Sequence, residues 1–69
     1  MDYTFVFENP VDVVTFDAKT IYGALRQLSE YMIENNLFLC NLAPYYQTSK
    51  RSFLLKQIHI NFLEKELLS

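Results

Sequence analysis

Cys40 and His59 are the only cysteine and the only histidine in the sequence, a combination that can serve as nucleophile and general base. A reactive thiol needs a lowered pKa, which a helix N-terminus or a neighbouring cation provides. Cys40 is instead flanked by Leu39 and by Asn41-Leu42, a pattern typical of a strand. We therefore expect a buried structural cysteine and a histidine on a strand or at the surface, with no catalytic role for either.

The sequence also has too few suitable side chains for a metal site, and its carboxylates show no pattern that favours acid–base catalysis. A structural zinc site needs four ligands, mostly Cys and His, and the chain has one of each. The acidic pairs Asp12 with Asp17 and Glu64 with Glu66 would need a cleft that shifts their pKa values before they could transfer protons. The single glycine cannot form a phosphate-binding loop. The sequence thus predicts a protein that is not an enzyme and holds no metal or cofactor.

The most suggestive segment is the polar, aromatic and basic stretch 45–51, Tyr-Tyr-Gln-Thr-Ser-Lys-Arg. Tyr and Arg are enriched at the hot spots of protein interfaces. Two aromatic rings beside two cations could also stack a nucleic-acid base and hold a phosphate. A third interpretation is a solvated loop whose tyrosines close the edge of the core. The residues that we expect to bind a partner are Tyr45, Tyr46, Lys50, Arg51 and Lys56.

Length and composition limit the protein to one small domain, residues 1–69. A chain of this size buries only about 60% of the surface that its unfolded form exposes, so its stability margin is narrow. One cysteine excludes an intrachain disulfide. Hydrophobic residues make up 51% of the chain and aromatic residues 16%, and so small an interior cannot hide them all. Some apolar surface is therefore expected to contact another molecule, a second copy in a homodimer included.

The formal net charge of −2 argues against a general nucleic-acid-binding protein, which usually carries a basic patch on a basic domain. The first seven residues lack the basic and apolar regions of a signal peptide. No stretch approaches the roughly 20 apolar residues that span a bilayer. A lone thiol is compatible with a reducing compartment. We therefore expect a cytoplasmic protein without a membrane association.

Two strands and a turn are predicted at the N-terminus. Tyr3 to Phe7 alternate between aromatic and smaller side chains, and Val11 to Phe16 form a second run that is mostly β-branched and aromatic. Asn9 and Pro10 between them are turn residues. A connection this short predicts an antiparallel β-hairpin.

An amphipathic helix is predicted to follow. Thr20 has the side chain of an N-cap, and Asn35-Asn36 can end the helix because Asn tolerates the left-handed conformation. The apolar residues between them recur at helical spacing: Ile21, Ala24, Leu25, Leu28 and Met32. Gly23 in the first turn costs about 1 kcal/mol relative to Ala, which suggests that the helix approaches the sheet closely there.

The C-terminal half is less regular. Residues Leu37 to Leu42 are predicted to form a third strand that Ala43-Pro44 ends, with a loop over residues 44–52. In the tail, residues 53–69, the alternation from Ile58 to Phe62 favours a fourth strand to about Phe62 and a short helix after it, with a second full helix as the alternative. The fold class is α+β with a small antiparallel sheet. Because both sheet faces are partly apolar, the tail or another chain is expected to cover the second face.

The step Phe16-Asp17-Ala18-Lys19-Thr20, followed by Ala24-Leu25 and Leu28, resembles a pattern of very small phage and mobile-element proteins. In these proteins a hairpin ends in F-x-A-x-[S/T] and a helix with A-L-x-x-L follows. Several anti-CRISPR inhibitors are built on such β-β-α cores. The resemblance covers roughly residues 3–39, although Gly23 stands where an acidic residue is usual. It implies a phage-encoded stoichiometric inhibitor that binds a host nuclease effector complex in the host cytoplasm.

The sequence alone therefore predicts a non-catalytic protein-binding module. Two alternatives stay open: a small nucleic-acid-binding regulator that uses the Tyr/Lys/Arg loop, and a self-associating structural subunit.

Overall fold

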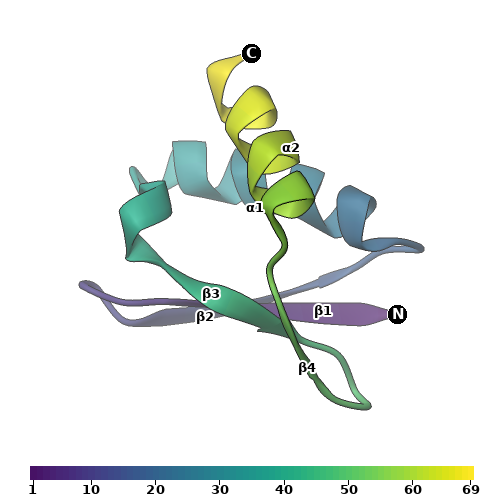
Figure 1. The fold of residues 1–69 in the computed structure, drawn as a ribbon. Helices are drawn as coiled ribbons and strands as arrows, with labels where there is room; N and C mark the ends of the chain where they lie inside the picture. Colours follow the sequence, from purple (N-terminus) through teal and green to yellow (C-terminus); the bar gives the residue numbers. More distant parts are fainter.

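The computed structural model describes all of residues 1–69 and shows an α+β fold of one sheet and two α-helices (Figure 1). In chain order the elements are β1 (Asp2–Phe7), β2 (Asp12–Asp17), α1 (Ile21–Glu34), a 3-10 turn (Leu39–Asn41), β3 (Leu42–Gln47), β4 (Ser52–Leu54) and α2 (Gln57–Leu68). The predicted fold class is confirmed.

The four strands form one antiparallel sheet in the order β2-β1-β3-β4. The N-terminal hairpin is confirmed, with Tyr3 opposite Phe16 and Phe5 opposite Val14. β1 lies in the centre between β2 and β3, while β2 and β4 are the two edges. A register shift between Phe5 and Phe7 marks a bulge where β3 joins β1.

Both helices lie on the same side of the sheet, as Figure 1 shows. The alternation of β1 turns Tyr3, Phe5 and Phe7 towards the helices, and all three are buried. They meet the apolar stripe of α1, whose members Ala24, Leu25, Leu28 and Met32 are fully buried. The core is therefore one layer of side chains between the sheet and the helices.

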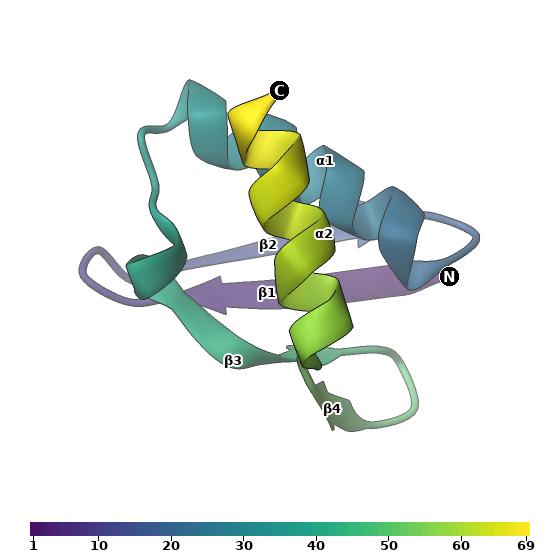
Figure 2. The same cartoon turned by 45° about the horizontal axis from the view of Figure 1, so that its top comes forward.

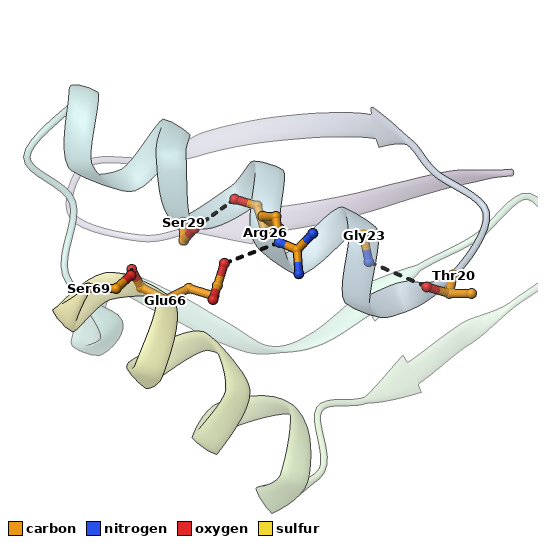
Figure 3. Close-up of polar contacts among 6 residues, drawn as sticks. All are labelled: Thr20, Gly23, Arg26, Ser29, Glu66 and Ser69. Atoms are coloured by element: carbon orange, nitrogen blue, oxygen red, sulfur yellow. Dashed lines mark hydrogen bonds and ion pairs between the residues drawn. The ribbon is translucent and has the colours of Figure 1, made fainter.

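The local signals of α1 act as predicted. The Thr20 hydroxyl accepts from the backbone N–H of Gly23 (Figure 3), and Asn35 is the C-cap, followed by Asn36 in the left-handed region at φ 53°. A Cβ on Gly23 would lie 3.3 Å from the Cβ of Ala18, in the segment that joins β2 to α1. The glycine thus permits a close approach to that connecting segment.

α2 crosses over α1 and packs against it (Figure 2). Leu63 is completely buried and joins the core, and the ring of Tyr22 on α1 meets Phe62 at 5.1 Å between centroids. At the exposed side of the contact the Arg26 Nε lies 3.3 Å from Glu66 Oε1 (Figure 3). A partly exposed pair of this kind contributes little, so apolar burial is what holds α2.

The prediction for the third strand was wrong in its bounds. Leu37 to Leu42 do not form a strand, because residues 39–41 make a 3-10 turn and β3 begins only at Leu42. Pro44 does not end the strand but lies within it. The bulge region does not need an N–H from this position, and the Pro44 carbonyl accepts from the Leu55 N–H at 2.9 Å. The expected loop 44–52 therefore shrinks to a turn between Gln47 and Ser52.

The preferred interpretation of the tail was also wrong, and its alternative is confirmed. The fourth strand is only Ser52–Leu54, and the alternating run from Ile58 to Phe62 belongs to α2. In a helix, His59 and Leu63 share one face, and both are buried. Burial of this face against α1 and β3 decides between two patterns that the local sequence supports equally.

The tail does not cover the second face of the sheet, contrary to one of the two expectations. No segment of the chain crosses the face that points away from the helices (Figure 1). The side chains there are Asp2, Thr4 and Val6 on β1, Val13, Thr15 and Asp17 on β2, Tyr45 and Gln47 on β3, and Ser52 and Leu54 on β4. We call this surface the open sheet face.

Candidate functional site

The two neighbouring tyrosines of the predicted site point to opposite faces of the sheet. Tyr46 faces the helices and is only 8% exposed. Tyr45 lies opposite Leu54 on the open sheet face and is half-buried. The period of two along β3 enforces this split. The five predicted residues therefore do not form one site.

Tyr46 is the middle member of an aromatic row across three strands. Its ring stacks on Phe53 of β4 at 5.3 Å between centroids with an interplanar angle of 19°. On its other side Tyr3 of β1 lies at 6.0 Å. The guanidinium of Arg51 lies 5.7 Å from the centroid of Phe53 and caps the row, in reach of a cation–π interaction. We call Tyr3, Tyr46 and Phe53 the aromatic row.

The turn between β3 and β4 is organised by Thr48. Its backbone N–H donates to the Arg51 carbonyl at 2.9 Å. Its hydroxyl accepts from the backbone N–H groups of Lys50 and Arg51 at 3.3 and 3.4 Å. The turn therefore holds Lys50 and Arg51 at a fixed place beside the aromatic row, while the backbone N–H groups of Thr48, Lys50 and Arg51 are already occupied.

The row and the turn together line a cleft of about 410 Å³. Its lining residues are Met1, Tyr3, Ile21, Tyr46, Thr48, Lys50, Arg51 and Phe53. We call it the aromatic–cationic cleft. Its floor is apolar, its rim carries two cations, and no carboxylate lines it. Neither Lys50 nor Arg51 forms an ion pair, because the two pairs of the molecule involve Asp17 and Glu66 with other cations.

Sequence reasoning found three of these lining residues, Tyr46, Lys50 and Arg51, and missed the rest. The most important omission is Phe53, which is 38% exposed and directly opposite Tyr46. Recognition of a tight turn at residues 48–51 would have paired the two rings, because cross-strand partners share a face. Lys56 does not line the cleft; it is the N-cap residue of α2.

Burial perturbs two groups near the cleft. It raises the pKa of Tyr46 above its usual 10.0, with a smaller contribution from the charge of Tyr3, so the phenol stays neutral. Burial, and then the charge of Lys56, lower the pKa of His59 below 6.5. The Nδ1 of His59 accepts from the Lys56 backbone N–H at 3.1 Å, which requires that nitrogen to be unprotonated. The histidine is thus a neutral helix-capping side chain.

The expectations for the cysteine and the histidine need correction. Cys40 is exposed on the 3-10 turn before β3, not buried in a strand. His59 is buried in the first turn of α2, where its ring meets Tyr22 at 5.8 Å and Tyr46 at 6.0 Å. Cys40 precedes the start of β3, whereas His59 packs near the end of β3. The strand separates the two groups, so they cannot act together.

Comparison with family models, with curated proteins and with solved structures finds no match for this chain. Neither helix is long and apolar enough to cross a membrane. No group of three or more His, Cys, Asp or Glu side chains is placed to hold a metal ion.

Proposed function

We propose that this protein is a non-catalytic protein-binding module whose aromatic–cationic cleft receives a partner segment with an aromatic or large apolar side chain next to carboxylates. The observation that carries the proposal is that two cations without an ion-pair partner, Lys50 and Arg51, lie beside the partly exposed ring of Phe53 in a concave site. Arg and aromatic side chains in such pockets supply most of the binding energy at protein interfaces.

The chemistry of the cleft sets the kind of partner. A cation that already stacks on Phe53 keeps its N–H groups free at the ring's edge, where a carboxylate can accept two of them. The apolar floor favours a side chain that can leave water. A segment that alternates aromatic and acidic residues satisfies both requirements. The absence of acid in the lining removes competition from within the molecule.

A small nucleic-acid-binding regulator is the second candidate, favoured by the same stacked Arg51 and Phe53. Two features weigh against it. The backbone N–H groups of Lys50 and Arg51 donate to Thr48, so these two residues could hold a phosphate only through their side chains. The chain also carries a net charge of −2, which repels a polyanion at long range.

The resemblance to anti-CRISPR inhibitors gives the proposal a more specific form. In that form the partner is a host nuclease effector complex, and the protein blocks it by stoichiometric binding. Titration of the purified protein into a purified CRISPR nuclease reaction tests this form. We expect cleavage to stop near one equivalent per effector complex, and an Arg51→Ala variant to shift that point. Unchanged cleavage at large excess rejects the inhibitor but leaves the cleft to be tested separately.

The cleft itself is tested with defined probes in fluorescence anisotropy. The first probe is a labelled short peptide in which Phe alternates with Asp and Glu. The second has Lys at each acidic position, and the third is a labelled oligothymidylate. We expect binding of the acidic peptide only. Arg51→Ala and Phe53→Ala should each weaken it by at least about fivefold, which corresponds to roughly 1 kcal/mol.

Lys65→Ala is the matched control, because it removes an exposed cation on α2 that does not line the cleft. This variant should bind the acidic peptide as the parent does. Equal losses in Arg51→Ala and Lys65→Ala would mean that only net charge matters and would contradict the cleft. Preference for oligothymidylate, with affinity that falls steeply between about 50 and about 200 mM salt, would favour the second candidate.

A further inference from the structure

The outer edge of β4 lies directly beside the aromatic–cationic cleft, because Phe53 of this strand lines the cleft. β4 pairs with β3 on one side and with no strand on the other. In Figure 2 it lies at the margin of the molecule with no segment of the chain beyond it, and all three of its residues are exposed. The backbone N–H and C=O groups along such an edge are free to pair with another strand.

Two hydrogen bonds show how the backbone of β4 is turned. The Thr48 N–H donates to the Arg51 carbonyl at 2.9 Å. The Leu55 N–H donates to the Pro44 carbonyl at 2.9 Å. Bonded and non-bonded residue pairs alternate along an antiparallel ladder. Phe53 lies midway between Arg51 and Leu55, so its own N–H and C=O also point towards β3.

Ser52 and Leu54 therefore direct their N–H and C=O groups outwards, away from β3. No hydrogen bond of the turns, loops and caps involves the backbone of either residue. An antiparallel strand laid along β4 can exchange a pair of hydrogen bonds with each of them. Because β4 is so short, the backbone alone would bind weakly, and side chains must select the partner.

Both faces of the sheet are hollowed at this edge. Side chains of an added strand would alternate between the two faces. The helix side holds the aromatic–cationic cleft of about 410 Å³. The open sheet face has a hollow of about 380 Å³, whose lining residues are Tyr45, Gln47, Ser52, Phe53 and Leu54. Strand addition to a sheet edge uses this combination, with backbone groups for affinity and pockets for alternate side chains for specificity.

We propose that the partner segment of the aromatic–cationic cleft binds in an extended conformation, as a further antiparallel strand along β4. This inference rests on the proposed function and adds the conformation, direction and register of the partner. The partner residue opposite Phe53 shares its face of the sheet and is the aromatic or large apolar one. The partner residue on the same face beside Arg51 is the acidic one, because that cation has no ion-pair partner.

The antiparallel direction fixes the order of the partner's residues. The segment runs from Leu54 towards Arg51, so the aromatic residue comes two positions before the acidic one. The residue before the aromatic one lies opposite Leu54 and faces the hollow on the open sheet face, which favours an apolar side chain. Leu-Phe-Thr-Glu has this order. A peptide that strictly alternates Phe with Asp and Glu turns its carboxylates to the open sheet face when extended, so it should bind more weakly than Leu-Phe-Thr-Glu.

Fluorescence anisotropy with labelled peptides tests the proposal. The parent peptide carries Leu-Phe-Thr-Glu between Gly-Ser flanks, and two variants carry an N-methyl group on Thr or on Phe. The Thr N–H would point to β4 opposite Ser52, so its methylation should weaken binding at least about tenfold, through the lost hydrogen bond and collision of the methyl group with the edge. The Phe N–H would point away from β4. Its methylation is the matched control and should leave the affinity within about twofold of the parent.

Two further measurements test direction and register. A peptide with the reversed order Glu-Thr-Phe-Leu has the same composition, but it cannot place its ring at Phe53 and its carboxylate at Arg51 in the antiparallel direction. We expect it to bind at least about fivefold more weakly than the parent peptide. Hydrogen exchange followed by NMR should show that the amides of Ser52 and Leu54 become protected in the complex, because they then donate to the partner.

Equal effects of the two N-methyl groups would overturn strand addition, and so would unprotected amides at Ser52 and Leu54 in a saturated complex. Tighter binding of the reversed peptide, or of the strictly alternating one, would overturn the proposed direction or register. In each of these cases, binding that is still weakened by Arg51→Ala and Phe53→Ala would leave the proposed function intact. Failure of every peptide to bind would overturn both proposals.

Discussion

Replacement of Leu63 by Ala tests how α2 is held, the helix whose N-terminal half the sequence pattern favours as a strand. Leu63 is the one side chain of α2 with no exposed surface, and it joins a core cluster that includes Leu25, Leu28 and Met32 of α1. The substitution removes the main apolar anchor of α2 and leaves its exposed residues unchanged. Helix propensity does not suffer, because Ala is the best helix former.

The expected loss is large for so small a protein. Truncation of a buried Leu to Ala costs about 2–5 kcal/mol, from lost transfer free energy and the cavity left behind. At roughly 0.05–0.15 kcal/mol per residue, a domain of this length has a total free energy of unfolding of roughly 3–10 kcal/mol. A loss of about 3 kcal/mol would lower the Tm by roughly 12–24 °C.

Urea denaturation followed by circular dichroism measures this loss, with Leu68→Ala as the control. Leu68 belongs to the same helix but is 88% exposed, so its truncation should cost less than about 0.5 kcal/mol. A cost below about 1 kcal/mol for Leu63→Ala, or equal costs for the two variants, would refute the reasoning. Either result would mean that α2 is not held by this contact.

Three further predictions concern single groups. Because the pKa of His59 is lower in the folded protein than its unfolded 6.5, the unfolded chain binds the proton first as pH falls, so stability should decrease as pH drops below about 6.5. Urea denaturation at several pH values should show this slope, and His59→Asn should flatten it because it removes the only imidazole of the chain. Gly23→Ala should raise the free energy of unfolding by less than the full gain in helix propensity, which is about 1 kcal/mol, because the new Cβ would lie 3.3 Å from the Cβ of Ala18. A larger gain for the same substitution in an Ala18→Gly background, measured by urea denaturation, would confirm the contact. The Tyr31 hydroxyl donates to Asp12, and this hydrogen bond, followed by burial and by the charge of the carboxylate, raises the pKa of Tyr31. Asp12→Asn should therefore lower the pKa of Tyr31 in an NMR titration. An unchanged pKa would contradict the role of Asp12.

The N-terminal half of the fold could be predicted because its signals are local. The alternation of residues 3–7, the turn at Asn9-Pro10 and the Thr20 cap each act within a few residues, and each is confirmed. β3 was misplaced because Pro44 is normally a strand breaker. Its tolerance depends on a bulge against β1 and on the partner strand β4, which no local window contains.

The tail could not be assigned because its two periodicities coincide over residues 58–62. Tertiary burial decides between them, because Leu63 is completely buried in the helical arrangement and a buried leucine contributes about 2–5 kcal/mol relative to alanine. The candidate site was found in part for a similar reason. Its cations are adjacent in sequence, but the pairing of Tyr46 with Phe53 exists only once the hairpin has formed.

The edges of the sheet bear on how far this protein can polymerise. β2 is an edge strand that begins at Asp12 and ends at Asp17. An aspartate at each end of this exposed edge strand discourages pairing with another chain, because charged side chains on an edge oppose the addition of a further strand. The other edge, β4, has three residues and offers few backbone groups. Growth of a continuous sheet into fibrils is therefore discouraged at both ends, as in many natural β-proteins.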